Sequence, residues 1–175
     1  FVDGIEVPII FHFGGLKSVL PIDVVETVDF YPGNFSVFYG RGTGGVFDAH
    51  IRRLNPDQFH GTMEFSALDI SLFAEAPIGD DFAVAVGGRR SIVGEVITAA
   101  VPDGANANVI AAPRYYDGQV LMNWRPEKGH DFRLFFLASD DVLELLFENP
   151  AEANAQLTGN QVSTGINFQR AVFEY

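Results

Sequence analysis

The sequence contains no cysteine, so neither a disulfide framework nor a thiolate metal site is available to it. Positive charge is scarce as well: 11 Lys and Arg residues stand against 23 Asp and Glu residues, and the formal net charge is −12. A charge of this sign argues against binding of nucleic acid, which needs a basic surface. No stretch reaches the roughly 18 consecutive apolar residues of a membrane-spanning helix. What remains is a chain of 175 residues, the length of one ordinary domain.

Residues suited to catalysis are few and scattered. The four histidines lie far apart in the sequence, and no nucleophile elbow is present. Asp140, Asp141 and Glu144 offer carboxylates that could serve hydrolysis or calcium binding. The residues that normally support either function are missing, and a solvated loop is the better explanation of this acidic group. We therefore predict no enzymatic activity, no cofactor and no metal site.

Phenylalanine and regular alternation are what the sequence has in abundance. It contains 17 phenylalanines, and from about residue 61 apolar and polar residues alternate with the period of a β-strand. The runs 62–67, 132–138 and 161–169 are the clearest examples, and turn-forming residues lie between the runs. The pattern predicts a mainly β fold after residue 61: a meander of about six antiparallel strands with no crossover helix and with two open edges.

Residues 1–54 differ in character from the rest. They carry glycine turns, short strands such as 27–31, and one helical candidate at 21–27, where Pro21 suits a first turn. We predict a compact α+β unit at 1–54 and a separate β unit at 55–175. Both ends of the chain lie inside strand-like runs, so we expect the chain to be an internal piece of a larger protein.

Two architectures explain the strands of the second unit. A soluble β-sandwich hides its apolar face, whereas a membrane barrel turns that face to lipid. The polar face of the last run is rich in amides and barely charged, and short connections alternate with long ones, as in outer-membrane barrels. Aromatic residues also lie near strand ends, where an interfacial girdle would be; they are Tyr115, Tyr116, Trp124, Phe147 and Tyr175. These features favour the barrel.

If the barrel is correct, the last strand has a defined orientation. Val162, Ile166 and Phe168 are then expected on the convex, lipid-facing side, and the alternate residues Ser163, Asn167 and Gln169 on the concave side. Apolar residues packed against a second sheet would instead support the soluble sandwich.

A glycine-rich stretch, "FYGRGTGGVFDAHIRR" (38–53), first suggests a phosphate-binding loop. Such loops require a helix after the glycines, whereas the residues that follow here alternate like a strand. Together with "FVDGIEVP" and "PIDVVETVDFYPG", the stretch resembles the C-terminal half of the plug of a TonB-dependent outer-membrane receptor. The matching positions are Asp3-Gly4, the strand 24–29, Tyr39-Gly40, and Gly44-Gly45 with the strand after them.

The resemblance implies a fold and a function. Residues 1–54 would be the C-terminal half of the plug, and 55–175 the truncated N-terminal strands of the transmembrane barrel. The whole protein would lie in the outer membrane of a Gram-negative bacterium. It would take up a scarce or large extracellular ligand by plug rearrangement driven through TonB. A plug-and-barrel protein for adhesion, secretion or surface assembly is the second possibility, and a soluble β-sandwich binding module is the third.

The resemblance also suggests site residues. Phe11, His12 and Phe13 correspond to the apical plug loop and are candidates for ligand contact, with packing of the phenylalanines in the plug core as the alternative. Only one of Arg89 and Arg90 should face the lumen, because side chains alternate along a strand.

Family members often carry Arg-Gly-Pro after the plug strand, and that arginine forms ion pairs with the barrel wall. This chain has Tyr31-Pro32-Gly33 there, and Arg41 could supply the charge. Gly44 and Gly45 are expected where the plug backbone turns into the linker, and residues 46–51 are expected to run as a strand beside residues 27–31. Both segments alternate, so each could present apolar residues to a small shared core.

Overall fold

The computed structural model describes residues 1–175 except 14, 16, 41, 101–108 and 148–160. A single 3₁₀ turn, η1 (Ile22–Val24), precedes the first strand, and one α-helix, α1 (Val93–Ala100), lies between the fifth and sixth strands. The strands are β1 (Val25–Tyr31), β2 (Val46–Ile51), β3 (His60–Phe65), β4 (Asp69–Ile78), β5 (Phe82–Ser91), β6 (Val109–Trp124), β7 (Phe132–Phe147) and β8 (Gln161–Glu174). The fold is mainly β, as the sequence predicts.

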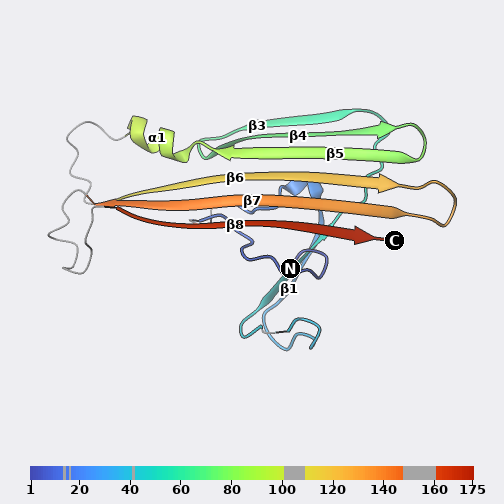
Figure 1. Ribbon diagram of the computed structural model, residues 1–175, viewed down its shortest axis with the longest axis horizontal. Coiled ribbons are helices and arrows are strands. Elements are labelled where there is room, and N and C mark those ends of the chain that lie inside the picture. Colours follow the sequence, from blue (N-terminus) through green and yellow to red (C-terminus); the bar gives the residue numbers. More distant parts are fainter. Residues whose placement is uncertain (14, 16, 41, 101–108, 148–160) are drawn as a thin grey trace.

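The six strands from His60 onward form one sheet in the order β3-β4-β5-β6-β7-β8, and each pairs antiparallel with the next. This confirms the predicted meander, with β3 and β8 at its edges (Figure 1). Helix α1 was not predicted. With eight residues it is shorter than three turns, and β5 and β6 remain antiparallel neighbours, so it makes no crossover.

The connections divide the sheet into two different ends. Residues 79–81 and 125–131 make short hairpins between β4 and β5 and between β6 and β7, at the end that we call the hairpin end. The opposite end has two longer connections, 92–108 and 148–160, and one short connection, 66–68 between β3 and β4. Short and long connections therefore alternate from β4 onward, whereas the β3–β4 connection departs from the predicted pattern.

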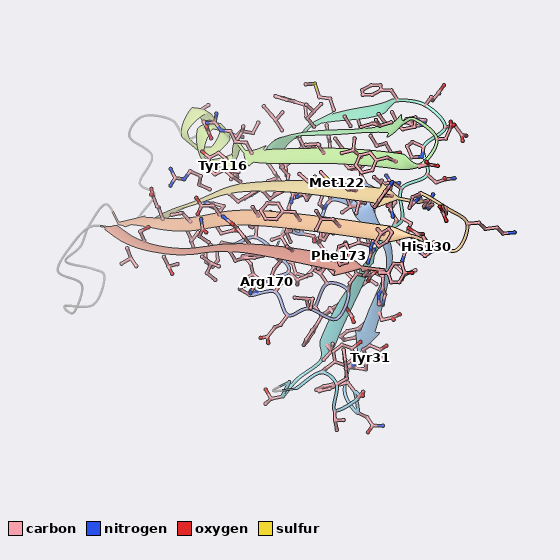
Figure 2. The ribbon with its side chains drawn as sticks, turned by 45° about the vertical axis from the view of Figure 1, so that its right-hand side comes forward. Tyr31, Tyr116, Met122, His130, Arg170 and Phe173 are labelled. Atoms are coloured by element: carbon pink, nitrogen blue, oxygen red, sulfur yellow. The ribbon has the colours of Figure 1, made fainter. Side chains whose placement is uncertain are left out.

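The two faces of the sheet have different surroundings. The inner face packs against residues 1–54: Phe73, Leu121, Phe135 and Leu137 belong to the same buried cluster as Val2, Val19, Val24 and Leu54 of the N-terminal unit. The alternate residues project from the outer face, where large apolar side chains are exposed. Residues 1–54 thus lie on one side of the sheet, and the β1–β2 hairpin extends away from it (Figures 1 and 2).

The orientation predicted for β8 is wrong. Phe168 is buried in the cluster that joins the sheet to residues 1–54, and Ile166 packs against that cluster, so both lie on the inner face. Ser163, Asn167 and Gln169 are exposed on the other face. The inner face of β8 is apolar because it meets the N-terminal unit and not water, and the covering is not a second sheet of a sandwich.

The helix predicted at 21–27 is reduced to the single turn η1, and β1 begins at Val25. Valines 24 and 25 and Thr27 are β-branched, which favours extended backbone over helix. The pairing of β1 with β2 is as predicted, with Tyr31 opposite Val46 and Phe30 opposite Phe47.

The small apolar core expected between β1 and β2 is not formed. Val28 and Phe30 are each 54% exposed, and the Phe30 ring stacks on the exposed Phe47 ring at a centroid distance of 4.4 Å. Val46 is buried on the opposite face of the hairpin, because it pairs with Tyr31, the residue next to Phe30.

Gly45 lies at the entrance to β2, where the backbone of β1 comes close. A Cβ atom there would lie 3.0 Å from the carbonyl oxygen of Tyr31 and 3.1 Å from the Phe30 ring, whereas a Cβ at Gly44 would meet nothing within 4 Å. We expect Gly45→Val to destabilise the hairpin by about 1–3 kcal/mol, the usual range for overpacking. Gly44→Val is the matched control. Protease susceptibility of residues 25–51 in the full-length protein measures the difference, and equal susceptibility of the two variants would contradict the steric explanation.

Candidate functional site

The interface between residues 1–54 and the inner face of the sheet holds an unusual number of buried charged groups. Asp69, Asp117 and Asp141 are all at most 7% exposed, and Arg133 is 4% exposed. Charged groups are seldom buried unless they are paired. The interface is therefore the place in the described chain where side-chain chemistry is concentrated, and three features make it up: a cluster around His12, a cluster around Arg133, and a cavity.

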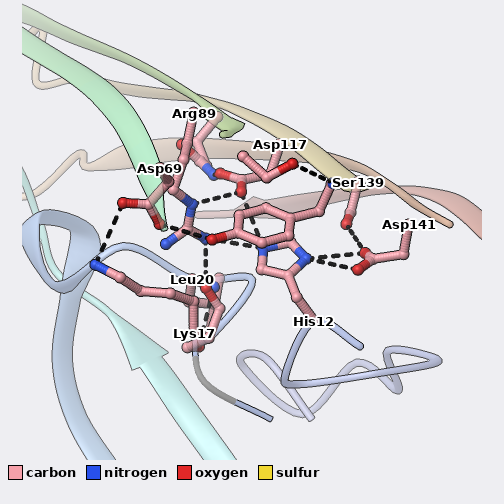
Figure 3. A network of polar contacts seen from close by, with 12 residues as sticks. His12, Lys17, Leu20, Asp69, Arg89, Asp117, Ser139 and Asp141 are labelled. Atoms are coloured by element: carbon pink, nitrogen blue, oxygen red, sulfur yellow. Dashed lines mark hydrogen bonds and ion pairs between the residues drawn. The ribbon is translucent and has the colours of Figure 1, made fainter. Parts of the chain in front are cut away.

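His12 forms the centre of the first cluster (Figure 3). It lies in a tight loop closed by the backbone hydrogen bonds from His12 N–H to Lys17 O and from Gly15 N–H to His12 O. Its side chain enters the inner face of the sheet and is 2% exposed. The ring stacks on Tyr115 of β6 with centroids 4.1 Å apart and planes only 11° from parallel.

Both ring nitrogens of His12 face carboxylates of the sheet. Nδ1 lies 2.9 Å from both oxygens of Asp141 on β7, and Nε2 lies 3.0 Å from Asp117 Oδ2 on β6. A neutral imidazole carries one N–H and would turn a bare lone pair toward one of these carboxylates, whereas the imidazolium donates to both. Burial lowers the pKa of His12, but the hydrogen bonds and charges of Asp117 and Asp141 outweigh it, and the pKa is raised above its ordinary value.

Arg89 of β5 joins the cluster from the sheet side. Its Nε donates to Asp117 Oδ2 at 2.7 Å, and its Nη2 donates to the carbonyl oxygen of Ser18 in the N-terminal unit. The same Nη2 lies 3.0 Å from His12 Nε2. The carboxylate of Asp117 thus lies between two cations and binds both, which links the loop of residues 12–18 to two strands.

A second layer of contacts surrounds this centre. The hydroxyl of Tyr115 donates to Asp69 Oδ2 at 2.9 Å, and Lys17 Nζ lies 3.5 Å from Asp69 Oδ1. Ser139 donates to Asp141 at 3.0 Å. With His12 protonated, three cations balance the three buried carboxylates of the cluster; they are His12, Lys17 and Arg89 against Asp69, Asp117 and Asp141. Lys17 also lies 3.2 Å from Glu64, whose side chain is exposed.

Arg133 of β7 forms the second cluster with the first turn of the chain. Its Nη2 lies 2.7 Å from Asp3 Oδ2 and 2.7 Å from Glu174 Oε1, and its Nη1 donates to the carbonyl oxygen of Ile51. The resemblance implies an arginine of the plug paired with the wall. In this chain the buried pair has the opposite polarity, with the acid on the N-terminal unit and the arginine on the sheet. Arg41 lies outside the described residues.

Asp3 tests how much this pair contributes. Burial raises the pKa of Asp3, although the charge of Arg133 and the N–H of Ile51 act in the opposite direction. Because burial of the carboxylate largely offsets its pairing, we expect Asp3→Asn to destabilise the interface by only about 1 kcal/mol. Asp3 has φ 46°, which asparagine tolerates and alanine does not, so Asp3→Ala should cost about a further 1–2 kcal/mol. Urea-dependent proteolysis of residues 1–54 measures both, and equal effects would contradict this account.

The other residues of the predicted plug motif shape the first turn and the β1–β2 hairpin. Gly4 has φ 74°, and its N–H lies 3.2 Å from Asp48 Oδ1. The Tyr39 hydroxyl donates to Asp48 Oδ2 at 2.8 Å, and this hydrogen bond raises the pKa of Tyr39. A Cβ at Gly40 or Gly44 would meet nothing within 4 Å, so neither glycine is required by close contact.

The candidate ligand residues separate in the structure. Phe11 is 48% exposed beside a cavity, while Phe13 is half-buried and its N–H reaches Asp141 at 3.3 Å. Their role in ligand contact stays a prediction. Arg89 is the arginine of the pair that faces inward, whereas Arg90 projects outward and pairs with Glu95 at 2.8 Å.

The sequence did not indicate that Asp117, Asp141 and Arg133 lie at one interface. Asp141 was considered only within an acidic loop, and the structure places it inside β7, on the same face as Phe135 and Leu137. Extending the alternation of 132–138 by three residues would have put Asp141 on the same strand face as Phe135 and Leu137.

The third feature is a cavity of about 400 Å³ beside the His12 cluster, between residues 10–28 and the inner faces of β3 to β6. It is considered further below. Within the described part of the chain, no group of three or more acidic, histidine or cysteine side chains could hold a metal ion. The two aspartates of the His12 cluster bind opposite edges of the ring and do not converge on one point.

Among the described residues, no helix is both long enough and apolar enough to cross a membrane. Comparisons with protein-family models, curated proteins and solved structures found no match for this chain.

Proposed function

We propose that this chain belongs to a TonB-dependent outer-membrane receptor that takes up a scarce or large ligand. In this proposal, residues 1–54 are the C-terminal half of the plug, and β3 to β8 are the first strands of the transmembrane barrel. The inner face of the sheet is then the barrel lumen and the outer face meets lipid.

The outer face of the sheet is the observation that carries the proposal. Strand register places its residues in rows across the sheet. Two adjacent rows are apolar throughout; they are Ala74, Val86, Val120, Phe136 and Ala171, and Ala76, Val84, Met122, Leu134 and Phe173. In a soluble protein, a continuous apolar surface of this kind would be costly to expose.

We call these two apolar rows the apolar belt. The rows on either side of the belt carry aromatic or polar residues, as the two surfaces of a bilayer require. At the hairpin end, Trp124 stacks on Phe132 at 5.3 Å and Phe132 stacks on Tyr175 at 4.8 Å, which resembles an interfacial aromatic girdle. Figure 2 shows His130 and Phe173 at this end and Tyr116 at the other. Toward the long connections, a polar row contains Arg90, Tyr116, Asp140 and Asn167.

The height of the belt also suits an outer membrane. From the row of Leu72 to the aromatic row that contains Ile78, Trp124 and Phe132, six residues along β4 span about 20 Å. This height includes the aromatic row, and the apolar band of outer-membrane barrels is ~25 Å tall between its girdles. The row of Leu72 contains glycines, Ala138 and Gln169. Tyr115, which was expected in the girdle, faces inward and is buried, and the side chain of Phe147 lies outside the described part.

The interface supports uptake because a plug has to be both held and movable. Its contacts with the sheet combine a buried apolar cluster with buried ion pairs and hydrogen bonds, and water can replace the polar contacts when they separate. A purely apolar interface of the same size would have no such substitute.

Fractionation of cells expressing the full-length protein tests the location. The protein should stay in outer membranes after alkaline carbonate washing, and release into the soluble fraction would overturn the proposal. Coupling to TonB is tested separately, by asking whether the purified receptor retains the periplasmic domain of TonB. A membrane-embedded protein that retains no TonB would favour the role in adhesion, secretion or surface assembly.

A further inference from the structure

Residues 51–55 connect the N-terminal unit to the sheet, and side chains at the hairpin end bind the backbone of this segment. Leu54 is 0% exposed. Its N–H donates to Asn123 Oδ1 at 2.7 Å, and its carbonyl oxygen accepts from Arg125 Nη2 at 3.0 Å. Both buried backbone groups would lose their partners if Leu54 moved, and leaving such groups unpaired is costly. Leu54 is therefore held firmly in place.

Arginines complete this attachment. Arg133 binds the carboxylate of Asp3 and the carbonyl oxygen of Ile51, and Arg53 Nη1 lies 3.0 Å from Asp131 Oδ1. We call these contacts, together with the two backbone hydrogen bonds above, the anchor. Its cations are arginines, which stay charged across the pH range in which an imidazole titrates, so a rise in pH does not neutralise them.

The anchor and the His12 cluster are far apart along the sheet. Asn123 and Arg133 lie opposite each other in register, whereas Asp117 of the His12 cluster precedes Asn123 by six residues on β6, about 20 Å at the rise of a strand. Among the described residues, no side chain takes part in both groups of contacts. Groups that far apart with no shared partner contribute almost independently to stability, so one can open while the other stays closed.

Arg52 marks the boundary between the two. Its N–H donates to the carbonyl oxygen of Val24 at 2.9 Å, and its Nε donates to that of Asp23. Its Nη2 binds Glu75 on β4. The turn η1 is thus tied to the anchor segment and to the sheet by a residue outside the His12 cluster.

We propose that the N-terminal unit opens at one side only: the loop of residues 12–18 leaves the sheet, while η1 and the anchor stay in place. The inference rests on the proposed function, in which this unit is part of a plug that moves during uptake. The cavity of about 400 Å³ lies between residues 10–28 and the sheet, so opening of the loop widens a space that already exists. The anchor keeps the chain in register with the sheet, and the loop can return to the same contacts.

Hydrogen exchange at two backbone amides tests the proposal, because each amide donates to a side chain of the sheet. Phe13 N–H lies 3.3 Å from Asp141 Oδ1 in the loop, and Leu54 N–H binds Asn123 in the anchor. In the full-length protein in lipid nanodiscs, His12→Ala should raise exchange at Phe13 by more than about 10-fold. Exchange at Leu54 should stay within about 2-fold of the wild-type rate. An equal rise at both amides would mean that the unit leaves the sheet as one body, and either that result or no rise at Phe13 would overturn the proposal.

Asn123→Leu is the reciprocal variant, because leucine is close to asparagine in size but offers no acceptor to the Leu54 N–H. It should raise exchange at Leu54 by about 10-fold and leave exchange at Phe13 within about 2-fold. A comparable rise at Phe13 would show that the two attachments form one cooperative unit and would contradict the proposal. Carbonate washing of each variant shows separately whether it is embedded, so a failure of the membrane proposal cannot be confused with a failure of this inference.

Discussion

Val86→Arg should prevent the full-length protein from assembling in the outer membrane. Val86 lies in the middle of the outer face of β5, 52% exposed, between Ala74 and Val120 in an entirely apolar row. An arginine on the lipid face near the bilayer midplane costs about 2–4 kcal/mol. On the surface of a soluble protein the same change usually alters stability by no more than ~0.5 kcal/mol. The two architectures therefore predict different outcomes for one substitution.

Asn167→Arg is the matched control, because Asn167 is also exposed on the outer face but lies in the polar row opposite Asp140. It should assemble normally. Assembly is measured as heat-modifiable migration on gels together with resistance to carbonate washing. If Val86→Arg assembles as well as Asn167→Arg, the apolar rows do not face lipid and the proposed membrane location is wrong.

The sequence predicts the sheet well because strand formation is a local property. The alternation in 62–67 and 132–138 is visible residue by residue. The turns at Gly79 and Gly129 are also visible in the sequence, because both glycines have positive φ, a conformation that favours glycine. Helix α1 was missed, because it falls in a stretch that was expected to be strand end and loop.

Which face of a strand lies inside is not a local property. Phe168 and Phe173 of β8 differ by an odd number of residues and so project to opposite faces; one is 6% exposed and the other 67%. Phe168 is buried against residues 1–54, whereas Phe173 projects from the outer face of the sheet. The prediction treated the inner face as lined by water and so assigned Phe168 to the wrong side.

The His12 cluster could be predicted only in part. The pattern around Phe11 and Phe13 identified His12 as unusual, but its partner Asp141 is 129 positions away in the sequence. Register sets Arg89 opposite Asp117 and sets Asp141 opposite Tyr115, so the three residues lie in two adjacent rows of the inner face. Neither the register nor the packing of residues 1–54 can be read from a single sequence.

His12→Ala should release the loop of residues 12–18 from the sheet. It removes one cation from a neutral buried cluster and leaves the carboxylate of Asp141 with donors only from Ser139 and the N–H of Phe13. Removing one partner of a buried ion pair typically costs about 3–5 kcal/mol. Limited trypsin digestion of the full-length protein, followed at Lys17, measures the release, because Lys17 lies in this loop and its side chain is only 25% exposed.

A second substitution separates charge from packing. In the His12→Ala background, Asp141→Asn removes the uncompensated charge, so the double variant should recover part of the protection at Lys17. Asp141→Asn alone should be destabilising, since His12 then keeps only Asp117 as an anionic partner. No recovery in the double variant would mean that the imidazole acts through its packing on Tyr115 and not through its charge.

The same cluster makes the interface sensitive to pH. The folded pKa of His12 is raised above the ordinary value of 6.5, so its stabilising contribution is complete below about pH 6.5 and is lost as the pH rises through the folded pKa. The charged groups that face the ring are Asp117 on β6, Asp141 on β7 and Arg89 on β5. Once the ring is neutral, Asp117 keeps Arg89, whereas Asp141 keeps the Ser139 hydroxyl and the Phe13 N–H, and its buried negative charge is unbalanced. Protection of Lys17 relative to that in His12→Ala should therefore fall as the pH rises above about 6.5. A wild-type profile parallel to that of His12→Ala would show that the ring is neutral throughout, with Nε2 accepting from Arg89.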